Sequence, residues 1–232
     1  MLKIEHLCKS YGDKKAVNDL SFKVKKGEFF AFLGVNGAGK STTINIICGQ
    51  LSKDSGTVKI CGRDSERDSD YIKRGIGVVF QNSVLDKELS VRDNLESRAA
   101  LYGIRGAEFK KRLARLSALL DFEELLRRPV GKLSGGQRRR IDIARALIHD
   151  PKILILDEPT RGIDVGAKYE IYELIINMAK QGKTVIVVSS EMPEILGITN
   201  RIGVMSNGRL SGIVNTKETN QEELLRLSAK YL

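Results

Sequence analysis

The residues with the clearest chemical meaning lie at positions 34–42, in the run Gly34-Val35-Asn36-Gly37-Ala38-Gly39-Lys40-Ser41-Thr42. This run fits the pattern G-x-x-x-x-G-K-[ST] at every position. In such a loop, backbone N–H groups surround phosphate oxygens, and the glycines let the backbone come close to them. Lys40 supplies a positive charge for β- and γ-phosphates, and the Ser41 hydroxyl is a hard oxygen ligand for Mg²⁺. The run therefore predicts a site for a nucleoside triphosphate and its magnesium ion.

Two adjacent carboxylates form a second candidate site, Asp157 and Glu158, directly after an apolar run at residues 153–156. At the end of a buried strand, Asp157 is able to hold Mg²⁺ directly or through water. Glu158 is placed to polarise an attacking water as a general base. An acidic turn at a strand end, with no catalytic role, is the alternative for the pair taken alone.

The elements around these residues predict how they are positioned. Residues 28–33 read as a buried strand before the loop, and residues 41–48 as a helix whose N-terminus favours an anion. Further apolar runs at residues 76–80, 153–156 and 184–188 alternate with helical patterns. Such continuous apolar strands are typical of a parallel sheet that is covered on both faces.

The remaining segments complete this α/β prediction. The early alternating runs at residues 2–5 and 20–24 predict a small antiparallel sheet, and residues 201–214 predict a hairpin. Residues 63–74 are polar and predict a loop. Apolar stripes between residues 90 and 147 predict helices. We therefore expect one domain, with a core of residues 1–85 and 147–232 and an inserted helical lobe at 86–146.

Composition and charge limit the partners that we expect. Hydrophobic residues make up 41% and charged residues 29% of the chain, and its net charge is +10. Residues 86–146 contain 15 Lys and Arg and 9 Asp and Glu, which predicts either a solvated helical lobe or a face near a membrane. Aromatic residues do not interleave the basic runs, which argues against nucleic acid. No apolar run is long enough to span a bilayer or form the core of a signal peptide.

A third motif makes the set specific. The run Leu133-Ser134-Gly135-Gly136-Gln137 is followed after sixteen residues by Leu154-Ile155-Leu156-Asp157-Glu158. With the loop at 34–42, these motifs resemble the ATP-binding cassette of ABC transporters over essentially the whole chain. The resemblance implies a P-loop NTPase (RecA-like) core with a mostly parallel sheet, a small N-terminal antiparallel β subdomain and an inserted α-helical subdomain. It also implies ATP and Mg²⁺ as cofactors.

The resemblance also implies roles for single residues. Gln81 matches the glutamine that contacts Mg²⁺ or water, although a polar strand cap is the alternative. Tyr11 matches the aromatic residue that stacks on adenine, against the alternative of an exposed turn tyrosine. Asp164 matches an aspartate at a dimer seam and is also a candidate helix cap. The remaining implied ligands meet the γ-phosphate that a second cassette holds: Ser134, Gly135, Gly136 and Gln137.

One position departs from the family pattern. The only histidines are His6 and His149, and Ser190 occupies the place after the strand at 184–188 where most cassettes have a switch histidine. Removing a donor to a developing charge raises a barrier by about 2.7–4 kcal/mol. We therefore expect Ser190 at the catalytic site and include a cassette with slow or regulatory hydrolysis as the alternative function.

The leading hypothesis is an ATPase subunit that drives transport through a separate transmembrane permease and pairs with a second cassette. Such a subunit is cytoplasmic, contacts the inner face of the membrane only through the permease, and binds no nucleic acid. A soluble ABC-type ATPase of translation or DNA repair is a further alternative. Residues 1–150 resemble ABC-2 or multidrug exporter cassettes, whereas residues 158–232 resemble the second cassette of monosaccharide importers. The sequence thus leaves the direction of transport and its substrate open.

Overall fold

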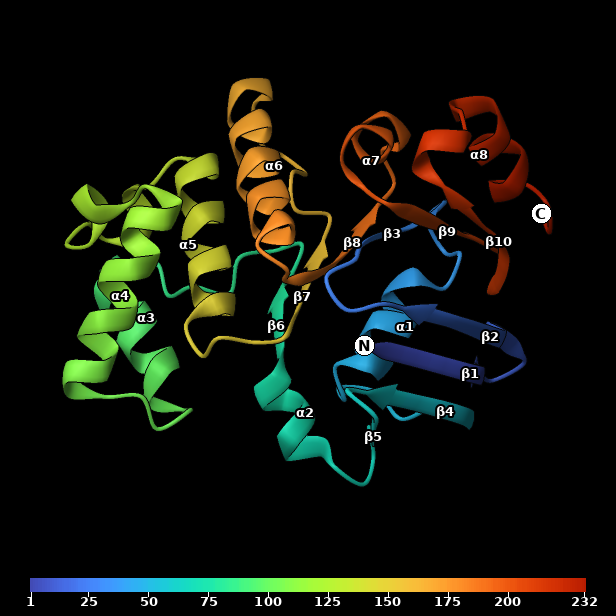
Figure 1. Cartoon of the computed structure of the whole chain (residues 1–232), viewed down its shortest axis with the longest axis horizontal. Helices are drawn as coiled ribbons and strands as arrows, with labels where there is room; N and C mark the ends of the chain where they lie inside the picture. Colours follow the sequence, from blue (N-terminus) through green and yellow to red (C-terminus); the bar gives the residue numbers. More distant parts are fainter. The chain divides into compact units, whose positions relative to one another are not determined.

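The computed structural model describes all residues from 1 to 232, in two compact units (Figure 1). The first unit contains residues 1–73 and 179–232, and the second contains residues 74–178. The predicted helical segment at residues 86–146 lies inside the second unit. The division into a core and an inserted lobe remains a prediction.

An antiparallel sheet in the first unit has the strand order β2-β1-β4-β5. Its strands are β1 (Leu2–Tyr11), β2 (Lys14–Val24), β4 (Ser55–Ile60) and β5 (Arg63–Asp64). Leu2 lies opposite Val24 on one side and Ile60 on the other, and all three are fully buried or nearly so. The alternating patterns at residues 2–5 and 20–24 are therefore confirmed as strands of a small antiparallel sheet.

The other strands of the first unit are mostly parallel. β3 (Phe29–Gly34) runs parallel to both β8 (Thr184–Ser189) and β9 (Arg201–Ser206). Every residue of β3 and β8 is buried, which explains their continuous apolar sequences. β10 (Arg209–Asn215) returns antiparallel to β9. The hairpin is confirmed, and both residues of its turn, Asn207 and Gly208, have positive φ angles.

The helices of this part of the chain are short. They are α1 (Lys40–Ile47), α2 (Ser69–Gly75), α7 (Met192–Ile198) and α8 (Gln221–Ser228), with a 3₁₀ turn at Thr216–Glu218. The predicted loop at residues 63–74 is wrong, because β5 and α2 lie there. Asp64 accepts hydrogen bonds from the backbone of Glu66 and Arg67 and orders the turn between them. Only Ile72 of α2 is buried, so an apolar stripe was absent from the sequence.

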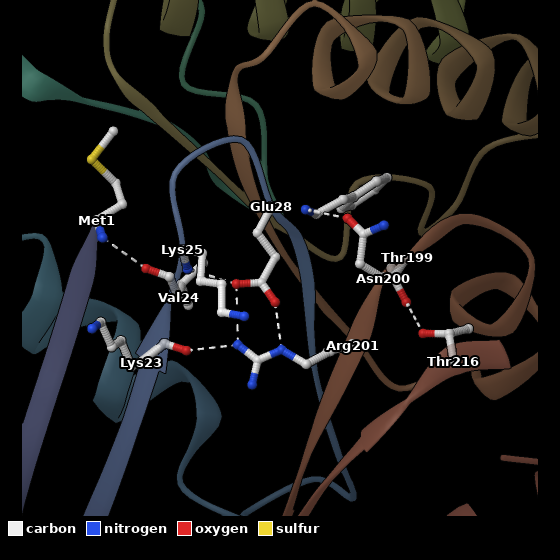
Figure 2. A network of polar contacts seen from close by, with 10 residues as sticks. Met1, Lys23, Val24, Lys25, Glu28, Thr199, Asn200, Arg201 and Thr216 are labelled. Carbon is white, nitrogen blue, oxygen red and sulfur yellow. Dashed lines mark hydrogen bonds and ion pairs between the residues drawn. The ribbon is translucent and has the colours of Figure 1, made fainter. Parts of the chain in front are cut away.

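A polar network fixes the first residues of β3 and β9 (Figure 2). Glu28 is 8% exposed, and both its oxygens accept hydrogen bonds from the Arg201 guanidinium. Its Oε2 also accepts a 2.6 Å bond from the backbone N–H of Lys25. Asn200 Oδ1 accepts a 2.8 Å bond from the N–H of Phe29. These bonds satisfy buried backbone groups at the start of β3, whose other end carries the phosphate loop.

The second unit consists of two parallel strands and a set of helices. β6 (Ile76–Val79) pairs with β7 (Ile153–Asp157). The helices are α3 (Val91–Ala100), α4 (Gly106–Leu120), α5 (Gly135–Leu147) and α6 (Val165–Lys180), and Figure 1 shows α3, α4 and α5 side by side. Two 3₁₀ turns lie between α4 and α5, at Glu123–Leu125 and Val130–Lys132. No helix of the chain combines the length and hydropathy needed to cross a membrane.

The predicted apolar stripes in the helical segment are confirmed by burial. In α3 they are Val91, Leu95 and Ala99, and in α4 they are Phe109, Leu113, Leu116 and Leu120. Ser90 caps α3 by accepting a 3.1 Å hydrogen bond from the N–H of Asp93. Parallel strands, helices and a separate antiparallel sheet confirm the predicted α/β class.

Candidate nucleotide-binding site

The predicted phosphate loop connects the end of β3 to the first residue of α1. Gly39 precedes the helix with a φ of 98°, which L-residues rarely adopt. A Cβ at Gly39 would also lie 2.3 Å from the carbonyl oxygen of Ala16, and one at Gly34 would lie 2.6 Å from that of Met205. Gly34 and Gly39 are therefore required by close backbone approach within the first unit.

Lys40 points back into its own loop. Its side chain is 6% exposed, and its Nζ donates hydrogen bonds to the carbonyl oxygens of Gly34 and Val35, the latter at 3.2 Å. This position places an ammonium group inside the loop, where phosphate oxygens bind in the predicted site.

Tyr11 and the start of α1 both line a cavity of about 350 Å³. Six of the nine predicted loop residues line it: Asn36, Gly37, Gly39, Lys40, Ser41 and Thr42. Three residues of the β1–β2 hairpin also line it: Tyr11, Lys14 and Ala16. Gly34, Val35 and Ala38 complete the loop without lining the cavity. An aromatic ring and a predicted phosphate-binding loop on the wall of one cavity suit a nucleotide. Lys14 and Ala16 are lining residues that the sequence analysis did not select.

The position of Tyr11 is fixed by hydrogen bonds to the residues just before it. Asp54 accepts a 2.8 Å bond from the Lys9 ammonium and a 2.6 Å bond from the N–H of Ser10. The Lys9 hydrogen bond is the larger of these two causes that hold the pKa of Asp54 below its usual value. The Lys9 ammonium also lies 6.0 Å from the centre of the Tyr11 ring, and the ring is 53% exposed. An exposed but anchored ring is suited to stacking on a base.

The residues at this loop fit a magnesium ion that is bound together with phosphates. Ser41 lines the cavity and is exposed, so its hydroxyl is accessible to a cation. The chain contains no cluster of three His, Cys, Asp or Glu residues that suits a metal ion. Mg²⁺ commonly uses one or two protein ligands, with waters and substrate phosphates completing its octahedron. The donor set therefore fits Mg²⁺ on a nucleotide better than an ion held by protein alone.

Ser190 follows the last residue of β8 and is exposed. Ser189 lies opposite Leu33 in the parallel register of β8 and β3. Because Leu33 directly precedes Gly34, Ser190 is at the same edge of the sheet as the phosphate loop. A catalytic role for Ser190 remains a prediction.

The predicted carboxylates and Gln81 lie at one edge of the strand pair in the second unit. Val79 of β6 is opposite Leu156 of β7, so the chain leaves both strands at the same level. Glu158 is 8% exposed, and its φ of 46° is in the left-handed region that is uncommon for residues other than glycine. Backbone strain of this kind is frequent at functional sites.

Sequence reasoning missed the residue that holds this edge together. Arg139 of α5 donates hydrogen bonds of 2.7 and 2.8 Å to the carbonyl oxygens of Phe80 and Gln81. Burial lowers the pKa of Arg139, and the charges of Asp142 and Asp157 oppose that shift. The sequence gives no direct signal for this contact, because Arg139 stands in a run of three arginines and its partners are 58 and 59 residues away.

Asp142 is a second buried charge on α5 that the sequence analysis did not select. Its Oδ1 accepts a 3.0 Å hydrogen bond from the Ser83 hydroxyl. Burial raises the pKa of Asp142, while Ser83, Arg139 and Arg145 oppose the shift. Asp142 and Arg139 both line a cavity of about 160 Å³ with Gln81, Gly135 and Arg161.

The Ser134–Gln137 motif forms the N-terminus of α5. Ser134 Oγ accepts from the N–H of Gln137, and Gln137 Oε1 accepts from the N–H of Ser134, which together form a capping box. A Cβ at Gly136 would lie 2.7 Å from that of Ala167 in α6. Part of this motif is therefore explained by local structure. Asp164 is confirmed as a cap of α6, because its Oδ2 accepts from the N–H of Ala167 at 3.1 Å.

Known proteins are similar to this chain in sequence. A family model described as ABC transporter matches residues 17–161. The galactose/methyl galactoside import ATP-binding protein MglA of Treponema denticola is 44% identical over 243 residues, which cover 100% of this chain and 48% of the relative. The corresponding protein of Treponema pallidum is 43% identical with the same coverage. The chain thus spans about half the length of the curated relatives that it matches.

Solved structures agree with the predicted fold as well. The cbiO1 protein of Clostridium perfringens, described as part of the ABC transporter complex cbiONQ, is 32% identical with a TM-score of 0.88, over 97% of this chain and 92% of that one. The ATP-binding cassette MJ0796, a dimer in a post-hydrolysis state with ADP and Pi, is 30% identical with a TM-score of 0.82, over 93% and 99% of the two chains. These similarities confirm the predicted fold of a P-loop ATPase cassette.

Proposed function

Because the chain belongs to the ABC transporter family, we propose that it binds ATP with Mg²⁺ and hydrolyses the ATP to ADP and phosphate. The observation that carries this proposal is the 350 Å³ cavity in which Tyr11 and the phosphate loop meet. ABC cassettes are similar to the chain over nearly its whole length, and one of them is described with ADP and Pi bound.

The residues of the first unit bind the nucleotide in this proposal. Tyr11 stacks on the adenine, and the backbone N–H groups of residues 34–42 surround the β- and γ-phosphates. Lys40 exchanges its bonds to carbonyl oxygens for bonds to phosphate oxygens, which are stronger because donor and acceptor then carry opposite charges. Ser41 supplies a hydroxyl ligand for Mg²⁺, and Gln81 and Asp157 are its further predicted ligands. The ion, when bound, neutralises charge that develops on the phosphates.

Glu158 is the proposed general base. Its carboxylate orients a water and accepts a proton from it as the water attacks the γ-phosphorus. Gln81 positions that water or the metal, and the two hydrogen bonds from Arg139 fix the backbone at residues 80 and 81. Ser190 supplies a hydroxyl where an imidazole is usual, and such a hydroxyl still donates one hydrogen bond. The comparisons offer no support for the alternative of a cassette with slow or regulatory hydrolysis.

We further propose that two cassettes act together on a transmembrane permease at the inner face of the cell membrane. In that pair, the motif at Ser134, Gly135, Gly136 and Gln137 of one cassette meets the γ-phosphate held by the other, and Asp164 lies at the seam. The dimeric cassette among the similar structures supports the pairing. The names of the curated relatives support import of a galactoside or a similar sugar, and those relatives align with the entire chain, residues 1–150 included.

Purification of the native complex tests the proposed partners. The tagged chain, expressed in its own host and extracted from membranes with detergent, is expected to bring a multi-span membrane protein with it. Reconstituted in liposomes, this complex is expected to take up sugar when ATP is supplied on the side of the cassettes. The same complex with Glu158→Gln is the matched control and is expected to assemble without transport. Recovery of the chain without any membrane partner would contradict the proposed coupling to a permease.

A further inference from the structure

One cation of the nucleotide cavity belongs neither to the phosphate loop nor to the residues that the family resemblance selects. Lys14 is the first residue of β2 and lies opposite Tyr11 across the turn of the β1–β2 hairpin. Both side chains line the cavity of about 350 Å³ with the phosphate loop. The hairpin thus presents an aromatic ring and an ammonium group to the same space.

The alternation of the strand separates Lys14 from its neighbour in the sequence. Lys14 and Ala16 line the cavity, and Lys15 between them does not. This is the expected pattern, because residues i and i+2 of a strand share a face. Lys15 is also exposed, so it provides a control of the same charge, the same strand and the same exposure.

The charges in the cavity favour an anion at Lys14. Its lining contains two ammonium groups, Lys14 and Lys40, and no carboxylate. Lys40 is buried in the loop on the carbonyl oxygens of Gly34 and Val35. Lys14 is exposed and has no ion pair or hydrogen bond from its side chain, and the nearest acid in sequence, Asp13, is outside the cavity lining. The Lys14 ammonium is therefore available to a ligand.

The position of Lys14 opposite Tyr11 indicates the part of the ligand that Lys14 meets. In the proposed function the adenine stacks on Tyr11, and the α-phosphate is the phosphate that is bonded to the nucleoside. We infer that Lys14 binds the α-phosphate of the nucleotide and thereby adds a second cation to the site. This inference rests on the proposed function, because it takes ATP as the occupant of the cavity.

A contact with the α-phosphate has a specific signature across a series of ligands. AMP, ADP and ATP all carry that phosphate, whereas adenosine lacks it. Lys14→Ala is therefore expected to weaken binding of the three nucleotides by a similar factor of roughly tenfold, the size of one exposed charge-assisted hydrogen bond. Adenosine binding is expected to stay the same. Lys14→Arg restores most of the affinity, since it retains the cation.

Competition against a fluorescent ATP analogue measures all four ligands on the parent chain, Lys14→Ala, Lys14→Arg and Lys15→Ala. The inference predicts parental affinities for Lys15→Ala and a weaker salt dependence for Lys14→Ala. It is overturned if Lys14→Ala binds nucleotides as Lys15→Ala does. It is also overturned if adenosine loses as much affinity as AMP, or if the loss grows from AMP to ATP. A parent chain that binds no ATP would instead contradict the proposed function.

Discussion

Gly37 and Gly39 both belong to the phosphate loop, but a glycine is required at each position for a different physical reason. Both have φ angles in the left-handed region, 83° and 98°. A Cβ at Gly37 meets nothing within 4 Å, whereas one at Gly39 meets the carbonyl oxygen of Ala16 at 2.3 Å. Gly37 is therefore required only for its backbone conformation, and Gly39 also for the close approach of β2 to the loop.

The two glycines predict unequal effects of the same substitution. Gly37→Ala places a Cβ in open space and is expected to lower the free energy of unfolding by about 1–2 kcal/mol through backbone strain. Gly39→Ala adds a clash with a backbone atom, which costs roughly 1–3 kcal/mol more. Urea unfolding of both variants measures the difference, and ATP titration is expected to show the larger loss for Gly39→Ala. Equal stabilities would contradict the close approach at Ala16.

At the residue scale, prediction from sequence is most direct where the candidate residues are contiguous. Residues 34–42 can be recognised from the sequence because one loop contains the whole phosphate-binding motif. Gln81 was selected by the family resemblance and Asp157 by its place after an apolar strand, and the parallel pairing of β6 and β7 brings both to one edge. The hydrogen bonds from Arg139 to the backbone near Gln81 escape such reasoning, because a charge run on a helix gives no indication of which arginine turns inward.

At the scale of elements, the N-terminal motif of α5 has clear structural constraints in addition to its proposed function. Its capping box uses Ser134 and Gln137, and its second glycine lets α6 approach closely. Gly135 is different, because the nearest atom to an added Cβ there is the Gly162 oxygen at 3.9 Å. Only one of the two adjacent glycines is therefore needed for helix packing.

This contrast gives a matched pair of variants. Gly136→Ala forces α5 and α6 apart and is expected to lower the free energy of unfolding by about 1–3 kcal/mol. Gly135→Ala is expected to leave it unchanged or to raise it by a few tenths of a kcal/mol, because alanine is the better helix former. Thermal or urea unfolding of the two variants distinguishes them. The packing of α5 against α6 would be refuted if Gly135→Ala lowered the free energy of unfolding and Gly136→Ala left it at the parental value.

Helices and strands were predictable where burial gave their sequences a recognisable pattern of apolar residues. β3, β7 and β8 appear as unbroken apolar runs because almost all their residues are buried. α2 gave no such signal, because Ile72 is its single buried residue and hydrogen bonds to Asp64 organise the chain just before it. Side-chain to backbone bonds of this kind leave little trace in a hydrophobicity pattern.

At the scale of the whole molecule, the chain divides the proposed chemistry between two units. The nucleotide cavity with Tyr11 and Lys40 belongs to the first unit, and Asp157, Glu158 and Gln81 belong to the second. The residues that line the nucleotide cavity are therefore different from the residue that is proposed to accept the proton. A substitution of the proposed base is therefore expected to affect turnover while leaving nucleotide binding nearly intact.

Phosphate release by the purified chain, compared with Glu158→Gln, tests the central claim most directly. Glutamine has nearly the same shape as glutamate and cannot accept the proton, so turnover is expected to fall by about 10²- to 10⁴-fold. ATP affinity, measured on the same preparations, is expected to change by less than about threefold because the cavity residues are unaltered. A parent chain that releases no phosphate from ATP, or a Glu158→Gln chain that releases it at the parental rate, would contradict ATP hydrolysis at Glu158.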